Sequence, residues 1–155
     1  MNLRRKAGTL YVGEEDVGIW KLETDPATGD TKVLMDTVED NPFLVDDVEG
    51  MSIYHLNEGG GYLVVSSQGD DTYALFDLET DAYVGSVAIV ANADAGIDGA
   101  SETDGLDVSS ANLGPGFEQG ALIVQDGRNV MPSENQNYKY VPWSSISEAL
   151  DLSSN

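Results

Sequence analysis

Acidic residues recur at matching positions in this sequence, in the turns beside short apolar segments. Asp47 and Glu49 come before one such segment and Asp104 comes before another, whereas Glu15 and Asp126 follow two others. Hard divalent cations prefer carboxylate oxygens as ligands. The pattern therefore predicts a metal site. Calcium, which takes about 6–8 oxygen ligands, is favoured over magnesium, which keeps more water and needs fewer carboxylates.

The segments that must position these acids form a repeat. Three similar apolar segments begin with glycine, and each is followed by a polar turn and then an aromatic segment. The glycine-led segments are Gly8–Val12, Gly61–Val65 and Gly120–Val124. The aromatic segments are Gly18–Leu22, Tyr73–Asp77 and Tyr138–Pro142. Their apolar and polar residues alternate with a period of two, which predicts β-strands and not repeated helices.

Two further kinds of strand complete the repeat unit. An acid–Gly segment precedes two of the copies, at Asp47–Ile53 and Glu102–Val108, and a fourth strand is predicted at Gly85–Ile89. Four strands in roughly 50–60 residues are typical of one blade of a β-propeller. The tail Ser144–Leu152 is predicted to be a short helix, with one of its first two serines as the N-cap.

The sequence therefore predicts an all-β chain: a single partial β-propeller domain over residues 1–155. It should comprise about two and a half to three four-stranded blades and a short C-terminal helix. The first glycine-led segment begins at Gly8, with no acid–Gly segment ahead of it. We therefore expect the chain to start inside a blade. Three blades or fewer cannot close a ring, since propellers have about 4–8 blades.

A propeller would bring the acids together. The first strand of each blade lies along the central axis, so Asp47, Glu49 and Asp104 should meet at one end of the channel. Calcium would offset the repulsion among them. The stretch Asn92–Gly99 resembles the start of an EF-hand loop, but its glycine comes two positions late and no helices flank it. We reject the EF-hand, although Asp98 stays a candidate oxygen ligand.

Composition narrows the functional classes. Asp and Glu number 28 against 7 Lys and Arg, a formal net charge of −21, which disfavours nucleic acid and anionic membranes as partners. Most of these acids are expected to be solvated surface, which also suits a salty medium. Cysteine is absent and histidine occurs once, so thiol chemistry and a histidine-rich zinc site are excluded. The sequence shows no signal peptide and no membrane span.

Six stretches of the chain, in order, resemble the C-terminal half of the β-propeller phytases. The resemblance implies a six-bladed, calcium-dependent parent enzyme, secreted or periplasmic in bacteria, which releases phosphate from calcium phytate. The stretches are Leu10–Asp16, Asp47–Met51, Gly61–Gly69, Thr103–Val108, Gln125–Gly127 and Asn135–Trp143.

The resemblance also assigns roles to individual residues. Glu15, Asp47, Glu49 and Asp98 match active-site calcium ligands, and we treat Glu15, Glu49 and Asp98 as the catalytic set. Asp104, Asp126 and Asn129 match further calcium-binding positions, whereas Arg128 stands where the family often has an acid. The residues that grip the substrate phosphates are expected in the N-terminal half of the parent propeller. Lys21, Lys32 and Lys139 are expected to be surface residues.

Three hypotheses follow. In the first, the chain supplies the acidic half of a phytase that acts on phytate and other inositol phosphates as calcium complexes. Several calcium ions would bind phosphate oxygens and activate a water, and the isolated chain would be inactive or weak. In the second, the chain is a non-catalytic calcium-binding half-propeller that associates with itself or with another chain. In the third, it is the inactive product of a truncated gene.

Overall fold

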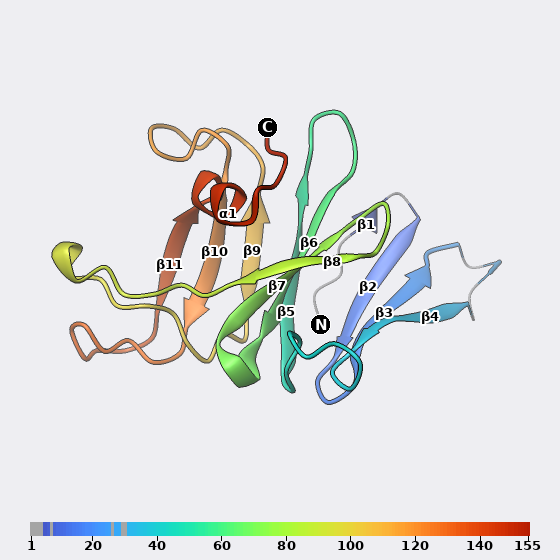
Figure 1. The fold of residues 1–155 in the computed structure, drawn as a ribbon, viewed down its shortest axis with the longest axis horizontal. Helices are drawn as coiled ribbons and strands as arrows, with labels where there is room; N and C mark the ends of the chain where they lie inside the picture. The colour runs from blue at the N-terminus through green and yellow to red at the C-terminus, as the bar shows by residue number, and fades with distance from the viewer. Residues whose placement is uncertain (1–4, 7, 26, 29–30) are drawn as a thin grey trace.

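The computed structural model describes residues 5–6, 8–25, 27–28 and 31–155. The rest of the segment that precedes the first glycine-led strand, residues 1–4 and 7, lies outside them. The described chain forms three antiparallel sheets and one short C-terminal α-helix (Figure 1). The expected all-β class is confirmed.

The first sheet has four strands in sequence order. They are β1 (Arg5–Lys6), β2 (Thr9–Glu14), β3 (Gly18–Glu23) and β4 (Lys32–Thr37). The two-residue strand β1 pairs with the start of β2, in the position that an acid–Gly strand takes in the other two sheets. Strand β4 was not predicted, because its apolar residues follow one another and do not alternate with polar ones.

The second sheet also has four strands in sequence order. They are β5 (Val48–His55), β6 (Gly61–Ser67), β7 (Thr72–Asp77) and β8 (Tyr83–Val87), with a single 3-10 turn, η1 (Gln68–Asp70), between β6 and β7. Every residue of β6 is buried. This sheet is therefore the centre of the molecule.

The third sheet has three strands, β9 (Leu106–Ser109), β10 (Ala121–Asp126) and β11 (Asn137–Pro142), in the order β11–β10–β9. The 3-10 turn η2 (Ala93–Ala95) lies in the long connection from β8 to β9. Helix α1 (Trp143–Leu150) follows β11 without a loop, so the N-cap is Pro142 and not the expected serine. No helix in the described part of the chain is long and apolar enough to cross a membrane.

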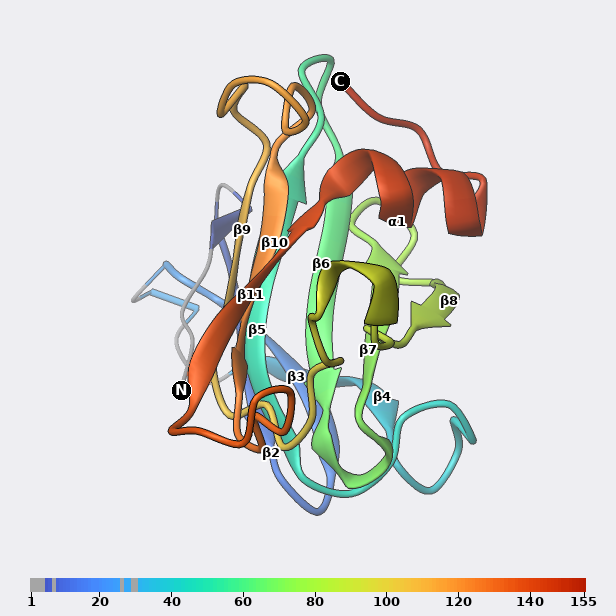
Figure 2. The ribbon, with the colours of Figure 1, turned by 90° about the vertical axis from the view of Figure 1, so that its left-hand side faces the viewer.

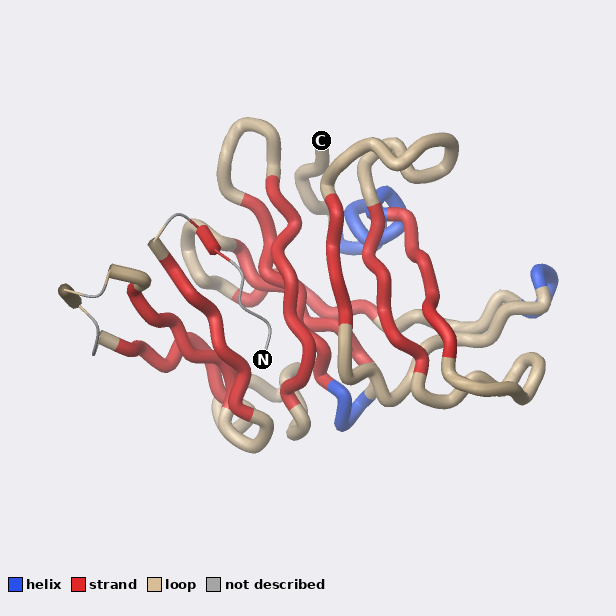
Figure 3. The backbone as a smooth tube through the Cα atoms, turned by 180° about the vertical axis from the view of Figure 1, so that it is seen from behind, coloured by secondary structure: helices blue, strands red, loops and turns tan. Residues whose placement is uncertain are grey.

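The sheets fan out side by side, with the second between the other two (Figures 1 and 3). Strand β5 contacts both β9 and β2. The close contact between β5 and the segment before β9 requires a glycine at position 50, because a Cβ there would lie 2.7 Å from the carbonyl oxygen of Asp104. Helix α1 contacts β8 and β11 and so bridges the second and third sheets (Figure 2).

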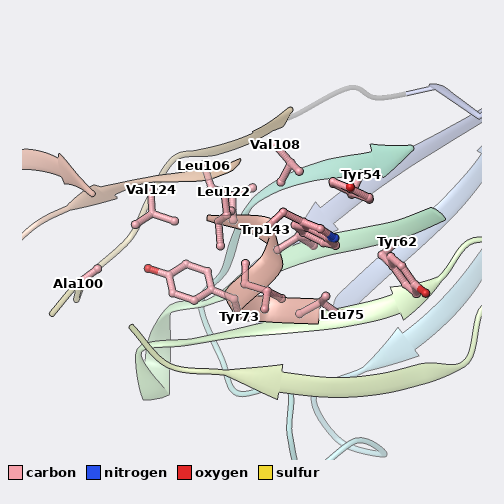
Figure 4. Packing of buried hydrophobic residues seen from close by; sticks show 12 residues of the cluster. Tyr54, Tyr62, Tyr73, Leu75, Ala100, Leu106, Val108, Leu122, Val124 and Trp143 are labelled. Atoms are coloured by element: carbon pink, nitrogen blue, oxygen red, sulfur yellow. The ribbon is translucent and has the colours of Figure 1, made fainter. Parts of the chain in front are cut away.

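Two apolar cores hold the fan together, one on each side of the second sheet. Between the second and third sheets, the fully buried Trp143 stacks on Tyr54 with ring centroids 3.8 Å apart (Figure 4). Between the first and second sheets, Tyr11 and Ile19 pack against residues of β5, β6 and β7. Trp143 and Tyr73, which is 1% exposed, are packing aromatics of this core.

Candidate functional site

Four acidic residues from three successive sheets lie near one another, at the end of the fan where β5 and β9 begin. Glu15 is in the β2–β3 turn, Asp47 directly precedes β5, Glu49 is the second residue of β5, and Asp104 precedes β9. The carbonyl oxygen of Glu15 accepts a hydrogen bond from the Val48 backbone N–H at 3.1 Å, which ties the turn to the start of β5. We call these four residues the acidic end.

Backbone and amide groups hold the acidic end in place. Asp47 adopts a left-handed conformation, with φ of 66°, and its carbonyl oxygen accepts a hydrogen bond from the Gln68 N–H. The Gln68 side chain donates to Asp104 Oδ1 at 2.8 Å. The Asp104 N–H in turn donates to Gln125 Oε1 at 2.8 Å. Gln68 thereby links the acids that precede the inner strands of two neighbouring sheets.

The charges at the acidic end act on one another. Partial burial raises the pKa of Glu49 above its usual value, and the negative charges of Glu15, Asp104 and Asp47, in that order, raise it further. Glu49 is half-buried, whereas the other three are exposed. A bound cation would offset this repulsion and favour the charged form of Glu49.

The residues at the acidic end fit calcium in their donor chemistry, because all four supply carboxylate oxygens. Among the described residues, however, no three or more His, Asp or Glu side chains converge closely enough to form a single ligand set. The backbone thus gathers the donors at one end of the fan without aiming them at one point.

Three other candidate residues lie in a second group, around a lysine. Lys139 Nζ donates to Asp98 Oδ1 at 2.5 Å and lies 2.9 Å from Asp126 Oδ2. The contact with Asp126 is an ion pair without the geometry of a hydrogen bond. A third contact, at 2.9 Å, joins Lys139 Nζ to Asn137 Oδ1. The ammonium group therefore donates two hydrogen bonds and has a second carboxylate within ion-pair distance.

The remaining oxygens of the two aspartates bind backbone groups. Asp98 Oδ2 accepts from the N–H groups of Val130 and Met131, and Asp126 Oδ1 accepts from those of Ser101 and Arg128. The hydrogen bond from Lys139, helped by the Val130 N–H, lowers the pKa of Asp98 to about 2. Burial alone would lower the pKa of Lys139, but Asp98 and Asp126 outweigh burial and raise it.

Asn129 borders the same group. Its Nδ2 donates to the Asn135 carbonyl oxygen at 3.3 Å, whereas its buried Oδ1 has no hydrogen-bond partner. Asn129, Asp98 and Lys139 all line a hollow of about 490 Å³ beside β11. The neighbouring Arg128 points outward and pairs with Glu102 at 2.6 Å.

The structure places the candidate residues in two groups, which differ in part from the expected ligand set. It brings Glu49 together with Glu15, Asp47 and Asp104, and the meeting of Asp47, Glu49 and Asp104 was expected. Asp98, expected beside Glu15 and Glu49, instead pairs with Lys139. Asp126 is the last residue of β10 and fully buried, not part of the following turn.

The expectation that Lys139 is a surface residue was wrong, because only 7% of it is exposed. Strand alternation could have revealed this, since Lys139 lies between two exposed tyrosines and so points to the opposite, core-facing side of β11. Lys21 is half-buried and pairs with Asp81 at 2.5 Å. Lys32 is exposed, and its ammonium lies 4.3 Å from the centre of the Trp20 ring.

The fold and this site define an all-β protein of repeated antiparallel sheets with carboxylates gathered at one end. Comparison with known proteins gives the family. The phytase family model matches residues 4–155, so the chain belongs to the phytase family. It is 38% identical over 146 residues to the 3-phytase of Bacillus subtilis (strain 168). The match covers 92% of this chain but only 37% of that relative's length.

Proposed function

We propose that this chain supplies the calcium-binding part of a propeller-shaped phytase, a hydrolase of phosphate monoesters such as phytate. The observation that carries the proposal is the acidic end, where three successive sheets contribute carboxylates that raise the pKa of Glu49. The match to a 3-phytase supports the substrate class. Because the chain spans only 37% of that relative, the proposed activity belongs to a larger unit.

In this proposal the acidic end binds several calcium ions. Glu15, Asp47, Glu49 and Asp104 would hold them through carboxylate oxygens, and Gln68 would orient Asp104. The bound ions would bind substrate phosphate oxygens and lower the pKa of a water. Binding would keep Glu49 ionised, despite the neighbours that raise its pKa in the chain alone.

The proposal gives the second group of residues a separate role. Lys139 neutralises part of the charge of Asp98 and Asp126 and fixes the loop that carries Val130 and Met131. Asp98 and Asn129 could still contribute oxygen ligands from the hollow beside β11, since the Asn129 Oδ1 atom is buried without a partner. The roles of Asp98, Asp126 and Asn129 in binding calcium remain predictions.

The second candidate function is a non-catalytic calcium-binding half-propeller that pairs with another chain. The observation in its favour is that both outer sheets of the fan expose large hydrophobic side chains, Leu34 in the first sheet and Tyr138 and Tyr140 in the third. Calcium binding is common to both candidates, whereas phosphate release belongs only to the first.

A chimera would test the hydrolase. This chain would replace the segment that it matches in the Bacillus subtilis 3-phytase, and phosphate release from phytate would be measured with calcium. We expect turnover by the chimera, its loss on Glu49→Gln, unchanged turnover on Glu39→Gln at an exposed position, and little or no release by the isolated chain. A chimera that is folded by circular dichroism but inactive would contradict the proposal.

A further inference from the structure

The first sheet has a largely apolar face on the side turned away from the second sheet. Directly paired residues of an antiparallel sheet lie on the same face. Such partners form two rows across β2, β3 and β4, Leu10–Leu22–Lys32 and Val12–Trp20–Leu34. The alternating residues Tyr11 and Ile19 are buried against the second sheet, so the two rows lie on the opposite side. We call this the Trp20 face.

The third sheet has a corresponding face at the other end of the fan. Its rows are Asp107–Ile123–Tyr140, across all three strands, and Gln125–Tyr138. The alternating residues Leu122 and Val124 are buried against the second sheet. Tyr138 and Tyr140 are 63% and 64% exposed. We call this the Tyr140 face.

We propose that a second copy of this chain covers both faces. The Tyr140 face of each copy packs against the Trp20 face of the other, and the two contacts are related by a two-fold axis along the centre of the ring. The stacking of successive sheets inside the chain, which buries Leu122 and Ile19 on either side of the second sheet, is the model for these contacts. The dimer thus continues an interface that the chain already uses twice.

The number of sheets suits a closed ring. The described residues of each copy form three sheets, so two copies hold six of these, and propellers have about 4–8 blades. Two identical contacts related by a two-fold axis close the assembly, whereas the same contact without closure would grow into filaments. A dimer covers both faces of every copy.

Charge favours unlike faces over like ones. Five of the seven basic residues fall within the first 32 residues, at the end of the chain that forms the first sheet. Lys32 belongs to a row of the Trp20 face. Asp107 belongs to a row of the Tyr140 face, although its Oδ1 accepts a hydrogen bond from Ser52 of β5 within the same chain. Pairing two Tyr140 faces would instead bring together the more acidic ends of two chains.

The ring would also bring the acidic ends of the two copies around one channel. Each copy contributes Glu15, Asp47, Glu49 and Asp104 from the start of its inner strands or the turn beside them. Repulsion between the two sets opposes assembly, and bound calcium would offset it. The dimer goes beyond the proposed hydrolase, since it could form whether or not the chain takes part in catalysis.

Molar mass in solution tests the dimer. Sedimentation equilibrium of the whole chain, with calcium and about 0.15 M salt to screen surface charge, should give twice the chain mass of 16.5 kDa. Tyr140→Glu and Leu34→Glu place a charge on one face each, and each should give the monomer. Leu113→Glu, at a 52% exposed loop position away from both sets of rows, is the control and should stay dimeric.

Four outcomes would overturn the proposal. The first is a wild-type monomer at every concentration, and the second is an open series of larger species. The third is a dimer that Tyr140→Glu abolishes and Leu34→Glu leaves intact, which would mean that two Tyr140 faces pair. The fourth is a dimer that neither change affects. If either variant loses its β-sheet circular dichroism, the exposed positions Tyr138→Glu and Lys32→Glu test the same faces.

Discussion

Lys139 Nζ lies 2.5 Å from Asp98 Oδ1, and only 8% of the lysine side chain and 4% of the aspartate side chain are exposed. This buried pair joins β11 to the connection between β8 and β9. Its aspartate is a candidate calcium ligand, and its partner is a cation of the same chain. The third sheet therefore balances some of its acidic charge without metal.

Removing the lysine should destabilise the fold strongly. Lys139→Met leaves Asp98 and Asp126 buried without their shared cation, and breaking a buried pair typically costs about 3–5 kcal/mol. Urea unfolding should show this loss in the free energy of unfolding. Lys32→Met, at an exposed lysine, should cost less than about 1 kcal/mol. Equal losses in the two variants would contradict the role given to Lys139.

At acid pH, Asp98 should contribute less to the stability of the folded chain. Because its pKa is lowered to about 2 in the folded chain, its charge stabilises the fold above its unfolded pKa of about 3.9. That contribution is lost as the pH falls from about 4 through 2. The stability difference between wild type and Asp98→Asn should thus be constant near neutral pH and shrink across this window.

The matched control for this pH dependence is Asp94→Asn, at an exposed aspartate in η2. Its stability should follow that of the wild type throughout the same series of urea unfolding curves. A difference between wild type and Asp98→Asn that stayed unchanged down to pH 2 would argue against the ion pair.

Of the two tryptophans, Trp143, the first residue of α1, should contribute more to the stability of the fold than Trp20. Trp143 is fully buried and stacks on Tyr54 and Tyr62, so Trp143→Ala should cost about 3–5 kcal/mol. Trp20 is half-exposed, and Trp20→Ala should cost clearly less. Thermal unfolding of both variants gives the comparison. A larger loss from Trp20→Ala would mean that the core beneath α1 is not the main one.

Much of the fold could be predicted from local pattern. The three glycine-led segments overlap β2, β6 and β10, and the two acid–Gly segments overlap β5 and β9, because alternation and turn residues act over a few positions. Strand β4 could not be found in this way, since Val33, Leu34 and Met35 are three consecutive apolar residues and give no alternation.

The arrangement of the site depends on contacts distant in sequence. The meeting of Glu49 and Asp104 followed from their equivalent places in the repeat, and Gly50 permits it by letting β5 approach the segment before β9. The burial of Lys139 could have been inferred from the exposed tyrosines beside it. Its pairing with Asp98, 41 positions away, could not.

Calcium titration by calorimetry tests the central claim most directly. The wild-type chain should bind calcium saturably near neutral pH and about 0.15 M salt. Glu49→Gln should weaken the tightest binding about tenfold or more, which corresponds to about 1.4 kcal/mol. Glu39→Gln, at an exposed glutamate outside the acidic end, should bind as the wild type does. Absence of saturable binding by the wild type, or equal weakening by both changes, would contradict the account.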